Sequence, residues 1–496
     1  MTHTEHPYAG GPAPLPPDLD EAVHRCLVAG FDGTTTVPDT LKRLIDRGLG
    51  GVILFTRNVR DAEQVRELTD TLRGIRPDLL VAIDNEGGDI GHLVSAGAPE
   101  VPGSFALGVV DDTRLTARCA DALAGHLASL GITASYAPVA DLQHHPLNPI
   151  VRTRSFGADP QLVSRHLRAW ITATQARGVA SCAKHFPGHG GTVTDSHHDV
   201  AVDPRPYDEL DLDPFRAAIA VGVPMLMSAH VVFPALDPDR PATLSPRILS
   251  GLLRDELGFD GVLVSDALEM KAIADRYGEA AGARLALEAG ADQVVVAVPD
   301  LGVTVGCRDA VLDAVGSGAL PAERVREAAD RVRRLADRYA APVAESAVAV
   351  ARWDVGAGLE AARRAVRGPV PHVRGAHVVD LFPPPHPALN WGGEDLLTEV
   401  RALDPTATGT AVTRAPADLT DLAAELLRRA EGAPLVVATY DAALHPWQAE
   451  LRDALLTGRA DAVRVSTGLP DGGDVCSYGR GRVNLRAVAE VLVGVA

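Results

Sequence analysis

The chain has 496 residues, more than one hydrophobic core usually holds, and this length predicts two domains of unequal size. Its 46% apolar and 23% charged residues are ordinary for a globular protein. The formal net charge of −18 argues against nucleic acid and anionic membrane surfaces as partners.

Residues 1–20, "MTHTEHPYAGGPAPLPPDLD", lack a basic start followed by an apolar core, so they predict a flexible leader rather than a signal peptide. No apolar run approaches the ~18 residues that a membrane span needs. The five cysteines are scattered and have no metal-type spacing, which indicates reduced thiols. We therefore expect a cytoplasmic protein.

Short apolar runs recur over residues 25–300, each continuous rather than alternating, as is typical of strands buried on both faces. Amphipathic stretches between them, such as 61–75, 159–178 and 245–258, open on Asp or Ser, which are favoured helix N-caps. Eight strands alternating with helices predict a (β/α)8 barrel of the TIM type over residues 21–340. The eight runs are 25–33, 50–58, 79–88, 132–142, 179–190, 223–233, 261–270 and 291–300.

Polar side chains follow four of these runs where each strand should end. They are Asp84 and Glu86 after "LLVAI", Lys184 and His185 after "VASCA", His230 after "PMLMSA", and Asp266 after "GVLVS". One polar residue after a strand often only caps the next helix. Four such positions on one rim favour an active site, because barrel enzymes build theirs at the carboxyl ends of the strands.

Beyond the barrel, the Ala- and Arg-rich residues 341–369 predict a linker that contains a helix at 358–368. Strand-like stretches at 377–382, 433–441 and 460–468 alternate with helical ones, which predicts a smaller α/β domain over 370–496 without an obvious catalytic cluster. The glycine-rich stretch 466–484 is interpreted as loop and turn before a final helix.

The stretch "KHFPGHGGTVTDSHHD", residues 184–199, is the richest in chemistry. Its histidines and aspartates could hold a metal ion, but glycine and proline between His185 and His189 prevent a helical pair of ligands. The metal interpretation therefore comes second. As acid–base chemistry, Asp195 would orient the imidazole of His197, and Asp266 is the natural carboxylate nucleophile for attack on an anomeric carbon.

The motifs "AKHFPGHGGTVTDSH", "VSDALEMKAI", "IDNEGG", "RSFG" and "PATLS" resemble glycoside hydrolase family 3, in particular its β-N-acetylglucosaminidase branch. They fall in the order of the family over about residues 25–340. The remainder resembles, more weakly, the C-terminal α/β sandwich of two-domain members. The resemblance implies the fold expected above, a small carbohydrate substrate, and no cofactor or metal ion.

The resemblance also implies roles for individual residues. Asp266 would be the nucleophile of a retaining mechanism, and His197, paired with Asp195, the acid/base. The implied sugar-binding residues are Asp84, Arg154, Lys184 and His185, while His189 is expected to shape its loop. His230 either lines the pocket or fills the rim.

One position departs from the family. Relatives often carry Asp-x-Glu-Gly-Gly-x-x-x-Arg, whereas here "DNEGGDIGH" places His92 where the sugar-binding arginine is expected. Arginine is permanently charged and bidentate, so this exchange is not conservative. Either a neighbouring group compensates, or the preferred sugar differs or the activity is weak.

The predicted activity is removal of terminal GlcNAc by an exo-β-N-acetylglucosaminidase, from muropeptides or glycosylated small molecules. A phosphorylase on the same scaffold is an alternative, because a histidine acid/base that has lost its proton repels phosphate less than a carboxylate would. A non-catalytic sugar-binding relative and a metallohydrolase are further alternatives. The sequence leaves the oligomeric state open.

Overall fold

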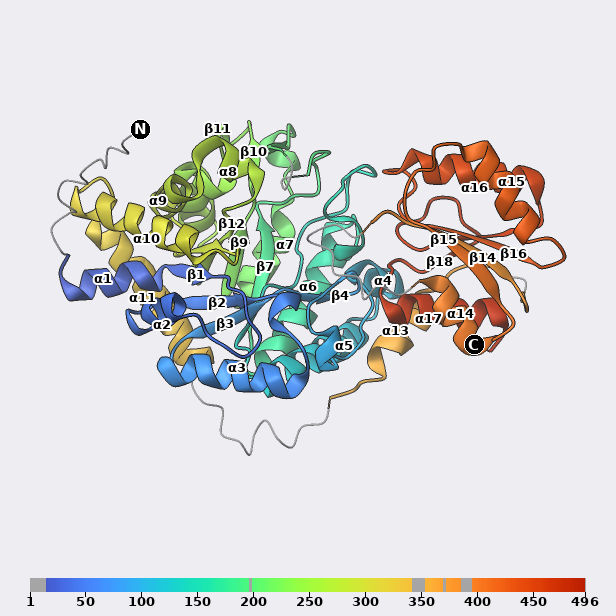
Figure 1. Ribbon diagram of the computed structural model, residues 1–496. Coiled ribbons are helices and arrows are strands. Elements are labelled where there is room, and N and C mark those ends of the chain that lie inside the picture. Colours follow the sequence, from blue (N-terminus) through green and yellow to red (C-terminus); the bar gives the residue numbers. More distant parts are fainter. Residues whose placement is uncertain (1–14, 196–198, 341–352, 369–371, 385–394, 496) are drawn as a thin grey trace, which may run out of the picture.

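The computed structural model describes residues 15–195, 199–340, 353–368, 372–384 and 395–495. Eight parallel strands close into a barrel in the order β1-β13-β12-β9-β7-β6-β3-β2. Each strand lies in one of the eight apolar runs, so the prediction of a TIM-type barrel followed by an α/β domain is confirmed (Figure 1). The strands are β1 (Leu27–Ala29), β2 (Gly51–Leu54), β3 (Leu80–Ile83), β6 (Ala134–Ser135), β7 (Ala180–Phe186), β9 (Met225–Ser228), β12 (Val262–Ala267) and β13 (Gln293–Val296).

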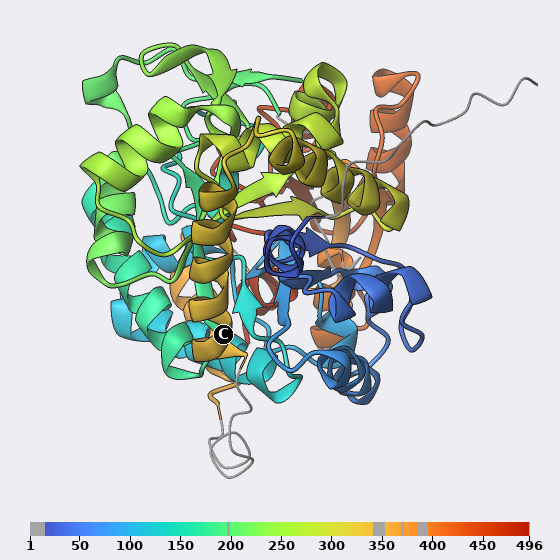
Figure 2. The same cartoon turned by 90° about the vertical axis from the view of Figure 1, so that its left-hand side faces the viewer.

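Helices surround the barrel (Figure 2). Asp61 and Asp159 accept backbone N–H groups at the starts of α3 and α6, as their sequence positions predict. The segment Arg247–Glu256, predicted as an ordinary helix, is a π-helix. The helices are α1 (Pro17–Arg25), α2 (Asp39–Asp46), α3 (Ala62–Ile75), α4 (Ser104–Val110), α5 (Thr113–Ser129), α6 (Pro160–Ala176), α7 (Leu212–Ala220), α8 (Lys271–Tyr277), α9 (Glu279–Ala289), α10 (Leu301–Gly316) and α11 (Ala322–Tyr339).

The helix α1 begins at Pro17, inside the range 1–20 that was expected to be a flexible leader. Proline at the first helical position has the backbone angle that a helix start needs, and Leu19 is buried against the barrel helices. Residues 17–20 are therefore helical.

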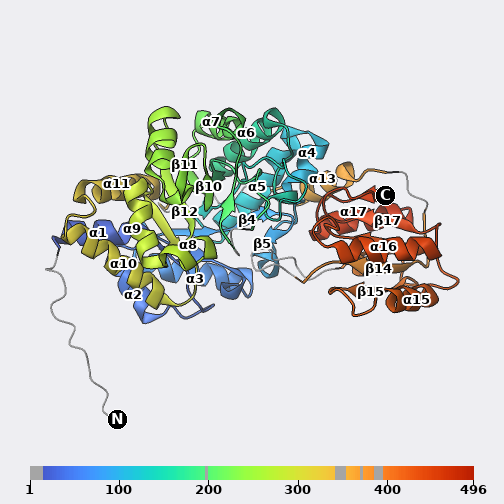
Figure 3. The ribbon, with the colours of Figure 1, turned by 90° about the horizontal axis from the view of Figure 1, so that it is seen from above.

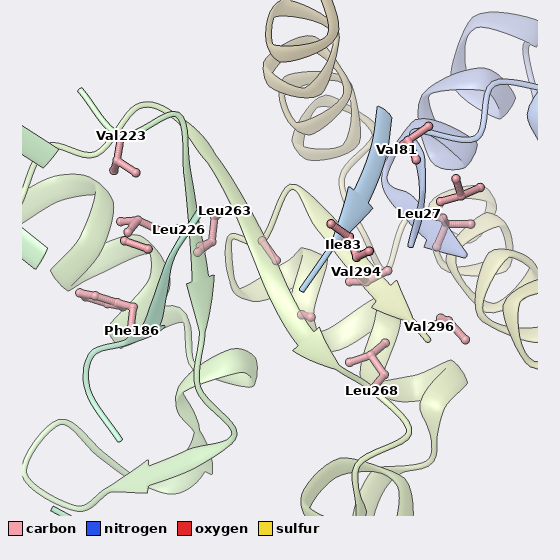
Figure 4. Close-up of a cluster of buried hydrophobic side chains, with 14 of the residues drawn as sticks. Leu27, Val81, Ile83, Phe186, Val223, Leu226, Leu263, Leu268, Val294 and Val296 are labelled. Atoms are coloured by element: carbon pink, nitrogen blue, oxygen red, sulfur yellow. The ribbon is translucent and has the colours of Figure 1, made fainter. Parts of the chain in front are cut away.

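Alternate strand residues pack inward and outward, which explains why the runs are apolar throughout. Outward side chains such as Leu226, Leu263 and Val294 lie beneath the helices (Figure 4). Inward side chains such as Val28 and Val264 form a second core with Tyr339 and other residues of α11. This helix therefore closes the end of the barrel at which the strands begin.

Short elements extend the carboxyl ends of the barrel strands. A hairpin of β4 (Asn85–Gly87) and β5 (Ile90–Gly91) follows β3, and the 3-10 turn η3 (Arg152–Arg154) follows β6. A small sheet joins β8 (Ala201–Val202), β10 (Val231–Phe233) and β11 (Asp237–Pro241). Further 3-10 turns are η1 (Thr56–Asn58), η2 (Val94–Ala96), η4 (Tyr207–Glu209) and η5 (Ala242–Leu244).

The C-terminal domain follows α13 (Ala357–Ala365), and its parallel sheet has the order β15-β14-β16-β17-β18. Separate apolar clusters lie on the two faces, one with α14 and α17 and the other with α15 and α16. The domain is therefore a three-layer sandwich, seen edge-on in Figure 1 and from above in Figure 3. The two-residue β18 lies inside the stretch interpreted as loop and turn. The elements are β14 (His377–Leu381), α14 (Leu396–Leu403), β15 (Thr408–Val412), α15 (Leu419–Arg429), β16 (Leu435–Thr439), α16 (Pro446–Gly458), β17 (Val463–Ser466), β18 (Val475–Cys476) and α17 (Arg482–Val493).

Candidate active site

A cavity of about 550 Å³ opens at the carboxyl ends of the barrel strands. Apolar walls such as Phe55, Tyr136 and Met270 surround a set of charged and polar side chains. Such a combination is typical of a small-molecule site. Of the residues singled out from the sequence, those that line it are Asp84, Glu86, His92, Arg154, Lys184, His185, His189 and Asp266.

A buried ionic cluster forms one wall of the cavity. Lys184 Nζ lies 2.5 Å from Asp84 Oδ1 and 2.7 Å from Glu86 Oε1. The guanidinium of Arg154 donates to both carboxylate oxygens of Glu86, at 2.9 and 2.8 Å. Burial disfavours charge in all of these groups, but mutual attraction outweighs it: the pKa of Glu86 is held well below its usual range, and those of Lys184 and Arg154 are raised. Glu86, Lys184 and Arg154 therefore stay charged at neutral pH.

Asp266 occupies the carboxyl end of β12, and its Oδ1 accepts the backbone N–H of Ala267 at 2.8 Å. Glu269, three residues later, also lines the cavity and accepts the N–H of Ala297 at 3.1 Å. Burial and the nearby charge of Asp266 raise the pKa of Glu269. The strand end thus presents two carboxyl groups in different environments.

Asp141 fixes the start of the loop that carries the histidine motif. Its buried carboxylate lies 2.7 Å from His185 Nδ1 and accepts the backbone N–H groups of His185 and His189, at 3.1 and 2.8 Å. Burial works to raise the pKa of Asp141, but the neighbouring His185 and His189 lower it overall. The Nδ1 side of His185 is thereby occupied by a carboxylate.

His189 lines the cavity besides shaping its loop. Its Nδ1 lies 2.9 Å from Thr192 Oγ1, and burial lowers its pKa to about 4, so the imidazole is neutral at pH 7. Asn148 donates to the carbonyls of His189 and Thr192, at 2.8 and 3.0 Å. These contacts anchor the first half of the loop.

Of the predicted acid/base pair, the structure describes Asp195. His197 lies outside the described residues, so its distance from Asp195 stays a prediction. Asp195 itself is half-buried, and its carbonyl accepts the N–H of Asp199 at 3.0 Å. Among the described residues there is no group of three or more His, Cys, Asp or Glu side chains placed to hold a metal ion.

His92 lines the cavity but is buried against protein groups. Its Nδ1 lies 2.9 Å from Thr56 Oγ1, and its ring contacts Phe55 edge-on, with a centroid separation of 5.3 Å. Burial lowers its pKa, which favours the neutral imidazole. Arg57 also lines the cavity, with its guanidinium 4.4 Å from the centre of the Phe55 ring. A permanent cation thus contacts the same aromatic ring as His92.

His230 does not line the cavity, so the expectation that it binds substrate is not supported by its position. It is fully buried, with Nδ1 2.8 Å from Thr243 Oγ1 and Nε2 2.9 Å from the carbonyl of Ala267. The rim position was correct, but the side chain turns toward the protein. Its contact with Ala267 supports the strand end that carries Asp266.

Sequence reasoning missed several residues of the site. Glu86 stood on the expected rim without an assigned role, although its "Asp-x-Glu" spacing after β3 was a usable signal. Asp141 ends the fourth apolar run, where a rim residue is also expected. Arg57 and Glu269 also lie near the ends of apolar runs, but nothing in the sequence distinguished them from residues that only cap the next helix.

The chain matches the model of the glycosyl hydrolase family 3 N-terminal domain over residues 21–335. A protein named beta-hexosaminidase from Bordetella pertussis is 36% identical over 320 residues, covering 62% of this chain and 87% of that protein. A solved structure of a family 3 beta-N-acetylglucosaminidase from Paenibacillus sp. has a TM-score of 0.87 and 32% identity, covering 96% of this chain and 97% of that chain. A beta-N-acetylhexosaminidase structure from Beutenbergia cavernae has a TM-score of 0.60 and 30% identity, covering 64% and 98%. The chain therefore belongs to glycosyl hydrolase family 3.

Proposed function

We propose that the protein is a retaining exo-β-N-acetylglucosaminidase that removes terminal GlcNAc from β-glycosides, such as muropeptides or glycosylated small molecules. The observation that carries the proposal is the position of Asp266 in the same cavity as the ionised cluster of Asp84, Glu86, Arg154 and Lys184. The names of the relatives, beta-hexosaminidase and beta-N-acetylglucosaminidase, support the choice of sugar.

In the proposed first step, a carboxylate oxygen of Asp266 attacks the anomeric carbon, and the bond from that carbon to the leaving oxygen breaks. His197, oriented by Asp195, gives its proton to the leaving oxygen. In the second step His197 takes a proton from water, the water oxygen attacks the anomeric carbon, and Asp266 is released. The sugar leaves with the configuration of the substrate.

The ionised cluster binds the sugar in this proposal. Asp84 accepts hydroxyl groups at the non-reducing end, and Lys184, Arg154 and His185 donate to sugar oxygens. Because their ion pairs already hold these groups in place, little side-chain freedom is lost on binding. Arg57 supplies the cation that His92 lacks, from η1 rather than from the hairpin after β3.

A panel of chromogenic β-glycosides, assayed with and without phosphate, tests the proposal. Release of GlcNAc in both buffers is expected, with the β-anomer appearing first by NMR. Sugar 1-phosphate as product would make the protein a phosphorylase, and no turnover of any glycoside would favour a sugar-binding relative. Activity lost on dialysis against EDTA and restored by zinc would favour a metallohydrolase.

The acid/base assignment has its own test. His197→Ala should slow substrates with poor leaving groups far more than activated aryl glycosides, because only the former need the proton in the first step. Rates for the two classes are compared under conditions where formation of the glycosyl intermediate is limiting. Equal losses in both classes would contradict the assignment.

A further inference from the structure

The strand order of the C-terminal sheet predicts a crevice of the kind that binds ligands in open α/β folds. Along the chain its five strands are arranged 2-1-3-4-5, so the order reverses between β14 and β16. Ligands of such folds bind beyond the carboxyl ends of the strands at this switch point. Here Tyr440 and the backbone of Arg480 contact a hairpin of the barrel, and Asp380 pairs with the side chain of Arg480.

The group that enters from the barrel is the carboxylate of Asp89, which is 3% exposed. Its Oδ1 accepts the backbone N–H of Arg480 at 2.8 Å, and its Oδ2 accepts the hydroxyls of Tyr440 at 3.2 Å and Thr153 at 2.7 Å. Two of these three donors come from the C-terminal domain. Burial raises the pKa of Asp89.

The C-terminal side of this contact is rigidly built. The guanidinium of Arg480 donates to both oxygens of Asp380, at 2.9 and 2.7 Å, and lies 4.0 Å from the centre of the Phe382 ring. Contacts within the C-terminal domain therefore hold Arg480 in position, independently of Asp89. A Cβ atom on Gly481 would lie 3.0 Å from the Cα of Gly88, so the two backbones approach closely at this point.

Asp89 belongs to the same hairpin that supplies Asp84 and Glu86 to the cavity. The other partner of Asp89, Thr153, is the middle residue of η3. The residues on its two sides, Arg152 and Arg154, face in opposite directions. Arg154 pairs with Glu86 in the ionic cluster, whereas Arg152 pairs with Asp441 of the C-terminal domain at 2.5 Å. Hairpin and turn thus each contact the cavity on one side and the second domain on the other.

We propose that Asp89 occupies the switch-point crevice as an internal ligand, and that the C-terminal domain thereby positions the Glu86–Arg154 pair for sugar binding. The role in sugar binding rests on the function proposed above. In this arrangement Asp89 and Tyr440 are positioning residues, since neither lines the active-site cavity. Loss of the contact should loosen the hairpin and weaken substrate binding, while the nucleophile on β12 is unaffected.

The test compares Tyr440→Phe with Tyr478→Phe. Both tyrosines belong to the C-terminal domain, but Tyr478 stacks on Phe105 of the barrel and is not part of the Asp89 contact. Tyr440→Phe should raise KM for 4-nitrophenyl β-N-acetylglucosaminide about three- to tenfold with a small change in kcat, in the range of one ordinary hydrogen bond. Thr153→Val, which removes the barrel-side hydroxyl, should do the same if Tyr440→Phe folds poorly.

Hydrogen exchange gives a readout that does not depend on turnover. Backbone amides of residues 84–92 should exchange faster in Tyr440→Phe and Thr153→Val, and at the wild-type rate in Tyr478→Phe. Unchanged exchange in both test variants, or a loss of activity that only follows a lower melting temperature, would overturn the proposal. An inactive wild-type protein would instead contradict the proposed function, while the exchange result would still decide the positioning role.

Discussion

The barrel and the C-terminal domain are both built on parallel strands, and both gather polar residues at the carboxyl ends of those strands. In the barrel these residues surround a cavity of about 550 Å³. In the C-terminal domain the barrel itself covers the corresponding edge, through Asp89 and Arg152. A smaller space of about 310 Å³ remains beside this contact. The same edge of a parallel sheet can therefore serve a substrate or another domain, and what covers it decides which.

The largest expected effect tests the open edge. Asp266→Asn should keep the fold and lower kcat by several powers of ten, because an amide cannot form the glycosyl ester. Turnover of an activated aryl glycoside measures the loss, and circular dichroism checks the fold. Near-normal turnover would remove Asp266 from the mechanism and, with it, the catalytic role of this edge.

The ionic cluster should be the next most sensitive feature. Glu86→Gln removes the partner of Arg154, and breaking such a buried pair should lower the free energy of unfolding by about 3–5 kcal/mol. Glu100→Gln breaks an exposed ion pair with Arg482 at the domain boundary and should cost less than about 1 kcal/mol. Urea unfolding compares the two variants.

The contribution of Glu86 to the free energy of unfolding should depend on pH in a defined direction. The folded-state pKa of Glu86 is depressed, so its stabilisation is complete above its unfolded pKa of about 4.3 and is lost as the pH falls toward the folded value. The stability gap between wild type and Glu86→Gln should shrink below about pH 5. A constant gap would show that charge is not the cause.

A smaller effect is expected at Arg57, the cavity residue that contacts Phe55 from the η1 turn. Arg57→Ala should raise KM about tenfold, the value for losing one hydrogen bond from a charged donor. His92→Arg alone should change KM little, because Arg57 is already present, but it should recover part of the loss in the Arg57→Ala background. Asp89 cannot capture the new guanidinium, since its carboxylate faces the second domain. No recovery would mean that the pocket was built around His92.

The smallest effect is expected at the covered edge. Asp471 follows β17 and accepts the hydroxyls of Thr439, at 2.6 Å, and Ser466. Asp471→Asn should leave kcat/KM within about twofold, with stability lower by about 1 kcal/mol for the weakened hydrogen bonds. A tenfold loss of kcat/KM at an unchanged melting temperature would show that this edge takes part in the reaction, and the comparison between the two edges would fail.

The barrel could be predicted from the sequence because a strand that is buried on both faces has a continuous apolar sequence. The same logic missed β15, whose sequence "TGTAV" is small, polar and partly exposed at a sheet edge, and β18, which is only two residues long. Within the site, position along a strand located Asp84, Lys184 and Asp266. Position along a strand does not give the direction of a side chain. The sequence therefore placed His230 on the rim but could not show that its ring turns away from the cavity and into the protein.

The burial of Asp89 has a consequence for protein engineering. Cutting the chain after residue 340 would remove the Tyr440 hydroxyl and the Arg480 amide, and would leave a carboxylate designed for a dry contact facing solvent on the hairpin that holds Glu86. We therefore expect that the barrel of this chain, although its ring of strands is closed, does not keep its hairpin in place on its own. A minimal version of it would need a redesigned hairpin tip as well as a new terminus.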